Sequence, residues 1–349
     1  MSLILLMNNF WKDKKVLITG HTGFKGSWLV LMLKSLDAQI FGISSEKREG
    51  VYQLTSLDSL IDKELFLNLS KDNPELKQNL KSFAPDIIFH FAAQSLVIDG
   101  YRNPSLTVKT NVIAPINLIE TIKECSLDTT FVIATTDKVY KYPSKDNVEG
   151  SELGGTDFYS TSKVSKELII DSYINHPDYK NINFNKVRSG NVIGGGERAN
   201  NRLFTDLIYA INNNMPIELR NPEHVRPWQY VLDSLYGYLL VAENSYMKQT
   251  SQTFNLNSEI NNKYSVFQIS ELFKQYADYK EDILVNNNSP YKEVEILKIN
   301  SSKAENDLGW KAKIEIPRII QLIVQWEKHH KKENSPEYSL NEVGDYLNL

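Results

Sequence analysis

The sequence predicts an α/β protein built on a doubly wound, mostly parallel sheet, and three observations support this fold class. Short apolar runs rich in β-branched residues alternate with helical segments, which is typical of βαβ units. A glycine-rich turn directly follows the first of these runs and opens the first helix. The chain has 349 residues, of which 41% are hydrophobic and 23% charged, so it is long enough for a substantial core.

The first half of the chain carries the clearest pattern. The expected strands are residues 16–19, 39–43, 86–91 and 130–134, and the expected helices are residues 28–36 and 112–125. After about residue 190 the pattern becomes irregular, with a glycine cluster at 194–196. We therefore predict a dinucleotide-binding Rossmann domain (1–190 plus about 227–257) and a smaller mixed α/β substrate-binding domain (about 191–226 and 258–349). The charged tail from Lys331 onward is expected to pack loosely.

Composition excludes several classes of partner. The net charge of −4 gives no electrostatic footprint for nucleic acid. The single cysteine, Cys125, suits a reducing compartment, no zinc-ligand spacing occurs, and His329–His330 is interpreted as a solvated helix end. The apolar segment 1–7 is too short for a signal-peptide core, and no run approaches the ~20 apolar residues of a membrane helix. We expect a cytoplasmic protein without a metal, nucleic-acid or membrane partner.

The glycine-rich turn predicts a dinucleotide site. Gly20, Gly23 and Gly26 lie between the first strand and its helix, where glycines permit a tight turn and let backbone N–H groups approach a pyrophosphate. After the second strand, Glu46 is the candidate partner of the adenosine ribose. Lys47 and Arg48 follow it, and since a basic residue would favour a 2′-phosphate, this turn alone leaves the choice between NAD and NADP open.

Two further groups predict the chemistry. Tyr159 and Lys163 are four residues apart, so they share one face of a helix, where an ammonium favours the phenolate needed to remove a hydroxyl proton. Thr136, Asp137 and Lys138 follow the strand at 130–134, at the end that faces the ligand crevice in doubly wound folds.

These motifs resemble a known family. The Gly-x-x-Gly-x-x-Gly and Tyr-x-x-x-Lys spacings resemble the extended short-chain dehydrogenases, and the hydroxyl–Asp–Lys sequence at 136–138 resembles the CDP-glucose 4,6-dehydratases within them. Further segments match that family in the same order: 20–28 (GHTGFKGSW), 90–94 (HFAAQ), 187–196 (VRSGNVIGGG), 220–222 (RNP), 226–229 (RPWQ), 302–304 (SKA) and 308–310 (LGW).

The resemblance implies a site. For NAD it implies Gly20, Thr22, Gly23, Phe24, Lys25, Gly26, Glu46, Asn68, Leu69, Phe91, Ala92, Ala93, Gln94, Asn111, Tyr159 and Lys163. For a nucleotide sugar it implies Gln94, Thr136, Asn191, Arg202, Arg220 and Arg226. It also implies a homodimer that pairs through two helices, one of them bearing the Tyr-x-x-x-Lys motif.

The implied reaction is a redox-neutral dehydration of CDP-glucose. Tyr159 takes the C4 hydroxyl proton as hydride leaves for NAD⁺, with Thr136 bonded to the same oxygen. Asp137 protonates the departing C6 hydroxyl, Lys138 removes or relays the C5 proton, and hydride returns to C6. Asp137 must then carry a proton and Lys138 must at times be neutral, and burial favours the neutral form of each.

Three departures from the family pattern widen the choice of function. The segment 140–148 is shorter and more polar than in the family, and Thr205 occupies a place where proline is expected, so another nucleotide sugar (a GDP-, UDP- or dTDP-hexose, or a heptose) is an alternative substrate. Asn68 stands where an aspartate normally meets adenine, which would weaken NAD binding. A nucleotide-sugar epimerase or reductase on the same scaffold and a catalytically silent NAD-binding protein also stay open.

Overall fold

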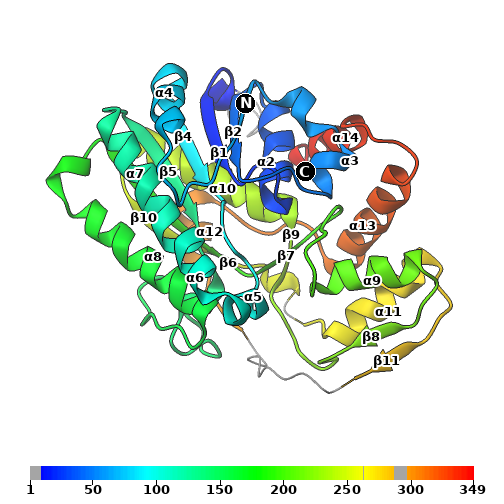
Figure 1. Cartoon of the computed structure of the whole chain (residues 1–349). Coiled ribbons are helices and arrows are strands. Elements are labelled where there is room, and N and C mark those ends of the chain that lie inside the picture. The colour runs from blue at the N-terminus through cyan, green and yellow to red at the C-terminus, as the bar shows by residue number, and fades with distance from the viewer. Residues whose placement is uncertain (1–8, 262, 287–296) are drawn as a thin grey trace.

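The computed structural model describes residues 9–261, 263–286 and 297–349. Seven parallel strands form one sheet in the order β10-β6-β5-β4-β1-β2-β3 (Figure 1). Their bounds are β1 (Lys15–Thr19), β2 (Gln39–Ser44), β3 (Lys63–Phe66), β4 (Ile87–His90), β5 (Thr129–Ala134), β6 (Ile182–Ser189) and β10 (Gln252–Leu256). This confirms the predicted doubly wound sheet. The segment 1–7, expected not to be a signal peptide, lies outside the described residues.

A hydrophobic layer lies on each face of the sheet, between the strands and the helices that cover them. The helices α4 (Pro74–Phe83), α7 (Ala114–Glu124) and α8 (Phe158–Ile174) pack on one face, and α2 (Phe24–Lys34) and α10 (Val231–Lys248) pack on the other. Side chains of the central strands are buried towards both layers: Leu17 and Ile88 face the α7 side, whereas Ile18 and Phe89 face the α2 side. Burial on both faces explains why these strands are continuous apolar runs.

The second half of the chain adds smaller elements beside the sheet. Two pairs of short strands occur, β7 (Asn191–Ile193) with β9 (Trp228–Tyr230), and β8 (Ile217–Leu219) with β11 (Ile283–Val285). Figure 1 shows β8 and β11 grouped with α9 (Leu203–Asn212) and α11 (Val266–Ala277) at one end of the molecule. The remaining elements are α3 (Val51–Leu54), η1 (Leu57–Leu60), α5 (Val97–Arg102), α6 (Pro104–Val108), the π-helix η2 (Lys109–Ile113), η3 (Asp137–Val139), η4 (Pro177–Tyr179), η5 (Glu259–Asn261), α12 (Ser302–Leu308), α13 (Ile316–His330) and α14 (Glu337–Leu347).

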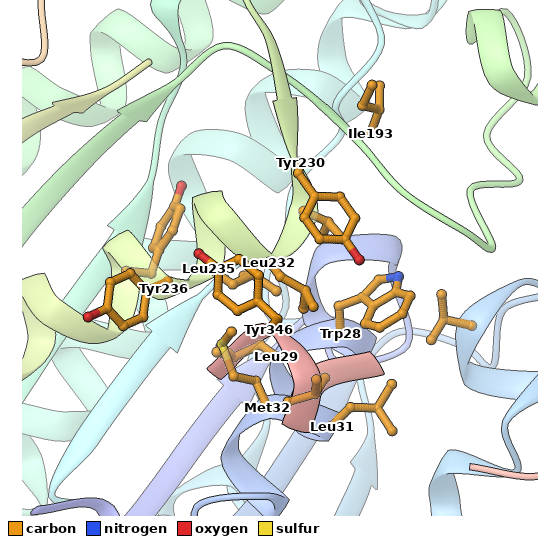
Figure 2. Packing of buried hydrophobic residues seen from close by; sticks show 14 of the residues in the cluster. Trp28, Leu29, Leu31, Met32, Ile193, Tyr230, Leu232, Leu235, Tyr236 and Tyr346 are labelled. Atoms are coloured by element: carbon orange, nitrogen blue, oxygen red, sulfur yellow. The ribbon is translucent and has the colours of Figure 1, made fainter. Parts of the chain in front are cut away.

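The C-terminal tail is not loosely packed, so that prediction is wrong. Helix α14 lies against α2, and its Tyr346 is buried with its hydroxyl donating to Asp233 Oδ1 at 2.8 Å. Figure 2 shows Tyr346 among Leu29, Met32 and Leu235 of the core. His330, expected in a solvated helix end, is also buried, and its Nε2 lies 3.3 Å from Ser339 Oγ. The apolar residues of α14 are spaced for one helix face, and the charges around them conceal that spacing.

Among the described residues no helix combines the length and apolarity that crossing a membrane requires. In the same part of the chain no cluster of His, Cys, Asp or Glu could hold a metal ion. The boundary between the two predicted domains stays a prediction.

Candidate active site

The glycine loop is folded tightly between β1 and α2. Gly20 has a positive φ of 77°, and a Cβ there would lie 2.7 Å from the backbone nitrogen of Ala92. A Cβ on Gly26 would lie 2.1 Å from the Gly20 carbonyl oxygen, so both positions require glycine. Helix α2 begins after Gly23 with no side-chain cap and no acidic residue in its first turn. Its first amides are therefore suited to an anion, at the point between β1 and β4 where the strand order reverses.

The turn after β2 carries no excess positive charge. Thr22 Oγ1 donates to the Glu46 carbonyl at 2.9 Å, which ties the glycine loop to this turn. The Glu46 carboxylate is exposed and lies 3.4 Å from Arg48 Nη2, and Lys47 Nζ lies 4.0 Å from Asp58. Because each cation has an acidic neighbour, the turn resembles a site for a ribose hydroxyl more than one for a 2′-phosphate.

Asn68 and Leu69 follow β3 beside a hollow of about 390 Å³, which Phe66, Asn68 and Lys71 help to line. The Asn68 Oδ1 accepts hydrogen bonds from the backbone nitrogen of Ser70 at 2.9 Å and from its hydroxyl at 2.8 Å. Leu69 is buried. The free hydrogen-bonding capacity of Asn68 at this hollow is therefore mainly its amide NH₂ group.

The loop after β4 (Phe91, Ala92, Ala93, Gln94) is fixed by one buried asparagine. Asn111 accepts from the Gln94 backbone nitrogen at 2.9 Å, and its amide donates to the Gln94 carbonyl at 3.0 Å and to Ser162 Oγ at 2.9 Å. Asn111 lies in the π-helix η2, and its side chain joins the loop after β4 to α8. Gln94 Oε1 is buried and lacks a partner among the described residues.

Thr136, Asp137, Lys138, Tyr159 and Lys163 meet at the carboxyl end of β5. A capping box of Asp157 and Ser160 starts α8, and this sets Tyr159 in its first turn. Tyr159 and Lys163 are both buried, and Lys163 Nζ lies 5.7 Å from the centre of the Tyr159 ring.

Of the two carboxylate oxygens of Asp137, only Oδ1 has a hydrogen-bond partner among the described residues. Its Oδ1 accepts from Thr136 Oγ1 at 3.0 Å and lies 3.7 Å from Lys138 Nζ. Its Oδ2 is buried without a partner among the described residues, although the residue is only 2% exposed. A buried carboxylate oxygen of this kind requires a partner, which a bound ligand would supply.

The electrostatics of this group follow from burial. Burial raises the pKa of Tyr159 to about 12, and hydrogen bonding with the Thr136 side chain and the charge of Arg202 partly oppose that rise. Burial also lowers the pKa of Lys163 to about 8. For Lys25, burial and then the charges of Lys163 and Arg202 lower the pKa to about 7. Lys25, although it lies in the glycine loop, is therefore close enough to Lys163 and Arg202 for their charges to affect its protonation.

Sequence reasoning missed the buried supports of this site. Lys166 is buried one helical turn after Lys163, and its Nζ donates to the Ala134 carbonyl at 2.6 Å, at the end of β5. Arg188 Nε donates to both carboxylate oxygens of Glu167, at 3.0 and 3.1 Å, and its Nη1 donates to the Tyr140 hydroxyl at 2.8 Å. In the sequence, the helical spacing of Lys163, Lys166 and Glu167 could have indicated that these charged side chains lie on one face of the helix.

The four predicted substrate-binding residues of the second half of the chain are not equivalent. Arg202 directly precedes α9 and lies nearest the catalytic group: it affects the pKa of Tyr159, and its buried Nε lacks a partner among the described residues. Asn191 begins β7, opposite Trp228. Arg226 is buried, with Nη2 2.7 Å from His224 Nδ1. Arg220 is half-exposed and lies 3.8 Å from Asp206, beyond β8.

Comparisons with known proteins agree with this geometry. The family model described as GDP-mannose 4,6 dehydratase matches residues 17–323. The chain is 33% identical to the CDP-glucose 4,6-dehydratase of Salmonella typhimurium, over 98% of this chain and 99% of that protein. The chain belongs to the nucleotide-sugar 4,6-dehydratase family. This family membership confirms the predicted class of enzyme, a lyase that removes water from an activated sugar.

More distant matches share the scaffold of this dehydratase family. The CDP-paratose 2-epimerase of Salmonella typhi is 24% identical over 89% of this chain and 98% of that protein. Among solved structures, the UDP-glucose-4-epimerase of Stenotrophomonas maltophila with bound NAD and formylated UDP-arabinopyranose has a TM-score of 0.79, 17% identity and coverage of 92% and 99%. The epimerase Mth375 of Methanothermobacter thermautotrophicus has a TM-score of 0.82, 18% identity and coverage of 95% and 97%. These structures show the fold.

Proposed function

We propose that this dehydratase converts CDP-glucose to CDP-4-keto-6-deoxyglucose and water, using NAD as a cofactor that is regenerated in each turnover. The observation that carries the proposal is the group at the carboxyl end of β5, where Asp137, Tyr159 and Lys163 are buried and the partly exposed Lys138 lies beside Asp137. A C4 oxidation needs the tyrosine and lysine, and the loss of water across C5 and C6 needs an acid and a base beside them. The similarity over nearly the whole chain to a CDP-glucose 4,6-dehydratase supports the choice of sugar and nucleotide.

The residues of the glycine loop fit NAD. The first turn of α2 presents amides without a side-chain acceptor, and Lys25 adds a cation close to them. Glu46, in the turn after β2, is proposed for the adenosine ribose, and the hollow that Asn68 helps to line, next to Leu69 in sequence, is proposed for adenine. Phe91, Ala92, Ala93, Gln94 and Asn111 would form the wall on the β4 side. When bound, NAD⁺ accepts the hydride from sugar C4 and later returns it to C6.

Each catalytic side chain has a proposed role. Tyr159 accepts the C4 hydroxyl proton, and Lys163 favours the phenolate by its charge. Asp137 donates a proton to the C6 hydroxyl, for which its unpartnered Oδ2 is available. Lys138 removes the C5 proton, directly or through water, and its side chain is 32% exposed, so it can exchange protons with solvent. The polar side chains Arg202, Arg226, Arg220 and Asn191 are proposed for the diphosphate, with Arg202 nearest the reacting sugar.

A homodimer is part of this proposal. Large apolar side chains are exposed on adjoining elements of one side of the molecule: Leu106, Val108 and Ile113 on α6 and η2, and Phe158 and Leu168 on α8. Helices α6 and η2 pack against α8, so these residues form a surface that a second copy could cover. The cytoplasmic location stays a prediction from the lone thiol of Cys125.

The test is a substrate panel. Purified protein would be incubated with NAD⁺ and with CDP-, dTDP-, GDP- and UDP-glucose in turn, and product mass would be followed. We expect loss of one water from CDP-glucose without net NADH. Water loss from a different nucleotide sugar alone would keep the reaction and overturn the nucleotide. Epimerisation without water loss, or NAD binding without turnover, would overturn the reaction itself.

A further inference from the structure

A histidine of the glycine loop is buried against the second strand of the sheet. The His21 side chain is fully buried, and a Cβ on Gly42 of β2 would lie only 2.6 Å from its Cγ. A glycine inside a strand lets another group approach the backbone closely, so β2 leaves room for this ring. On other sides the ring meets Tyr52 of α3 and Phe66 of β3, with ring centres 5.8 and 5.9 Å away. The His21 ring therefore lies beside a residue, Phe66, that helps to line the hollow proposed for adenine.

The two nitrogens of this ring belong to one chain of hydrogen bonds. The Nε2 atom of His21 lies 2.7 Å from Glu64 Oε1, and the Nδ1 atom lies 3.0 Å from Ser44 Oγ. Ser44 Oγ in turn accepts from the backbone nitrogen of Thr22 at 3.3 Å. The hydroxyl of Tyr52 donates to the same Glu64 oxygen at 2.8 Å, which holds the carboxylate in place. The chain thus runs from a carboxylate on β3 to a backbone amide of the glycine loop.

The direction of each hydrogen bond follows from the donors available. A carboxylate only accepts, so the Nε2 atom of His21 carries the ring proton. Burial lowers the pKa of His21, although hydrogen bonds of the ring and the charge of Glu64 oppose this effect, so the ring is neutral near pH 7. In a neutral ring Nδ1 is an acceptor, so Ser44 donates to it and keeps a lone pair for the Thr22 amide. This arrangement satisfies every donor of the chain.

We propose that Glu64, His21 and Ser44 are positioning residues that set the glycine loop for NAD, an inference that rests on the NAD site proposed above. Thr22 is joined twice to the end of β2 and the turn after it, through Ser44 and through its own hydroxyl, which donates to the Glu46 carbonyl at 2.9 Å. These bonds fix the amides proposed for the pyrophosphate relative to the turn proposed for the ribose. The His21 side chain is fully buried, so it does not touch the dinucleotide and acts through Ser44.

The experiment measures NAD affinity by calorimetry in the full-length chain freed of bound nucleotide. Ser44→Ala removes the hydroxyl that joins His21 to Thr22, and His21→Phe keeps a flat ring without its nitrogens. Each should raise the dissociation constant for NAD by about three- to tenfold, the effect of one lost hydrogen bond. Because both changes break the same chain, the double variant should bind NAD no more weakly than the weaker of the two single variants. In Ser44→Ala, kcat with CDP-glucose at saturating NAD should change little, because the chain acts on cofactor binding and not on the reacting groups.

Ser245, near the end of α10, gives a matched control. Its buried hydroxyl accepts from the Asn185 amide and donates to the Thr250 carbonyl, both at 2.7 Å. Thr250 precedes β10, so this serine lies at the end of the sheet opposite the glycine loop. Ser245→Ala therefore loses a comparable buried hydroxyl and should leave NAD affinity unchanged.

Several results would overturn the inference. If the wild-type protein binds NAD and neither Ser44→Ala nor His21→Phe weakens that binding, the chain does not position the loop. If the two effects multiply in the double variant, the two residues act independently. If Ser245→Ala weakens NAD binding equally, the loss is a general effect of removing a buried hydroxyl. If the wild-type protein itself binds no NAD, the cofactor proposal fails first, and this inference fails with it.

Discussion

The carboxyl group of Glu342 should make the stability of this protein depend on pH. Glu342 lies on α14, 8% exposed, and its Oε1 accepts from the Tyr230 hydroxyl, while Oε2 lacks a partner among the described residues. Burial raises its pKa from 4.5 to about 7, against the opposing effects of the Tyr230 hydrogen bond and the charge of Arg318. Because the pKa is higher in the folded state, the contribution of Glu342 to stability is complete below pH 4.5 and is lost as the pH rises through 7.

The magnitude follows from that difference in pKa. Each pKa unit corresponds to about 1.4 kcal/mol, so ionising Glu342 in the folded protein costs about 3 kcal/mol at most. Glu342→Gln keeps an acceptor for Tyr230 but cannot ionise. Its free energy of unfolding should match that of the wild type near pH 5 and exceed it by up to about 3 kcal/mol near pH 9. Urea unfolding at both pH values would measure this difference.

A matched control is available on the same helix. Glu337 is exposed in the first turn of α14, so Glu337→Gln should shift the unfolding free energy little and equally at both pH values. An equal shift for Glu342→Gln at both pH values would contradict the reasoning. If Glu342→Gln were less stable than the wild type near pH 9, the contradiction would be stronger, since the ionised Glu342 carboxylate would then stabilise the folded protein.

Three further predictions concern the site. Tyr159→Phe should lower kcat about 10²- to 10⁴-fold, as expected for a lost acid–base group, while calorimetry finds NAD affinity nearly unchanged; unchanged turnover would exclude the phenol as base. Lys25→Met should flatten the pH dependence of NAD affinity: in the wild type, with a Lys25 pKa of about 7, affinity should fall as the pH rises above 7, because the phosphates favour the ammonium form. If both proteins give the same profile, Lys25 does not face the phosphates. Arg188→Met should destabilise the protein by about 3–5 kcal/mol, because Glu167 would remain buried and charged without its partner; a loss below about 1 kcal/mol in urea unfolding would show that water reaches Glu167.

The elements that could be predicted are those with a clear hydrophobic pattern in the sequence. The four strands expected in the first half are present within one or two residues of their predicted bounds, since each is an apolar run buried on both faces. Helix α2 begins at Phe24 and not at Trp28, because the helix starts inside the glycine loop, where the sequence lacks apolar spacing. The three-residue strands β7, β8, β9 and β11 are too short to give any periodic signal.

The site was predictable where adjacent residues act together. Thr136, Asp137 and Lys138 follow one strand, and Tyr159 and Lys163 share one helix face, so sequence spacing places each set. Tertiary contacts were not predictable: the bond between Asn111 and Ser162 joins residues far apart in the sequence, and the position of Lys25 among catalytic charges depends on side-chain direction. Arg202 and Arg220 look alike in sequence, but the fold places Arg202 where its charge affects Tyr159 and Arg220 beside Asp206.

The central claim is a dehydration in which one hydride leaves C4 and returns to C6 of the same sugar. The most direct test is CDP-glucose carrying deuterium at C4, incubated with the holoenzyme and analysed by mass spectrometry and proton NMR. The account predicts a product that has lost one water, retains the deuterium, and carries it in the C6 methyl group. Deuterium at C4 of an epimerised sugar, deuterium lost to solvent, or an unchanged substrate would contradict the account.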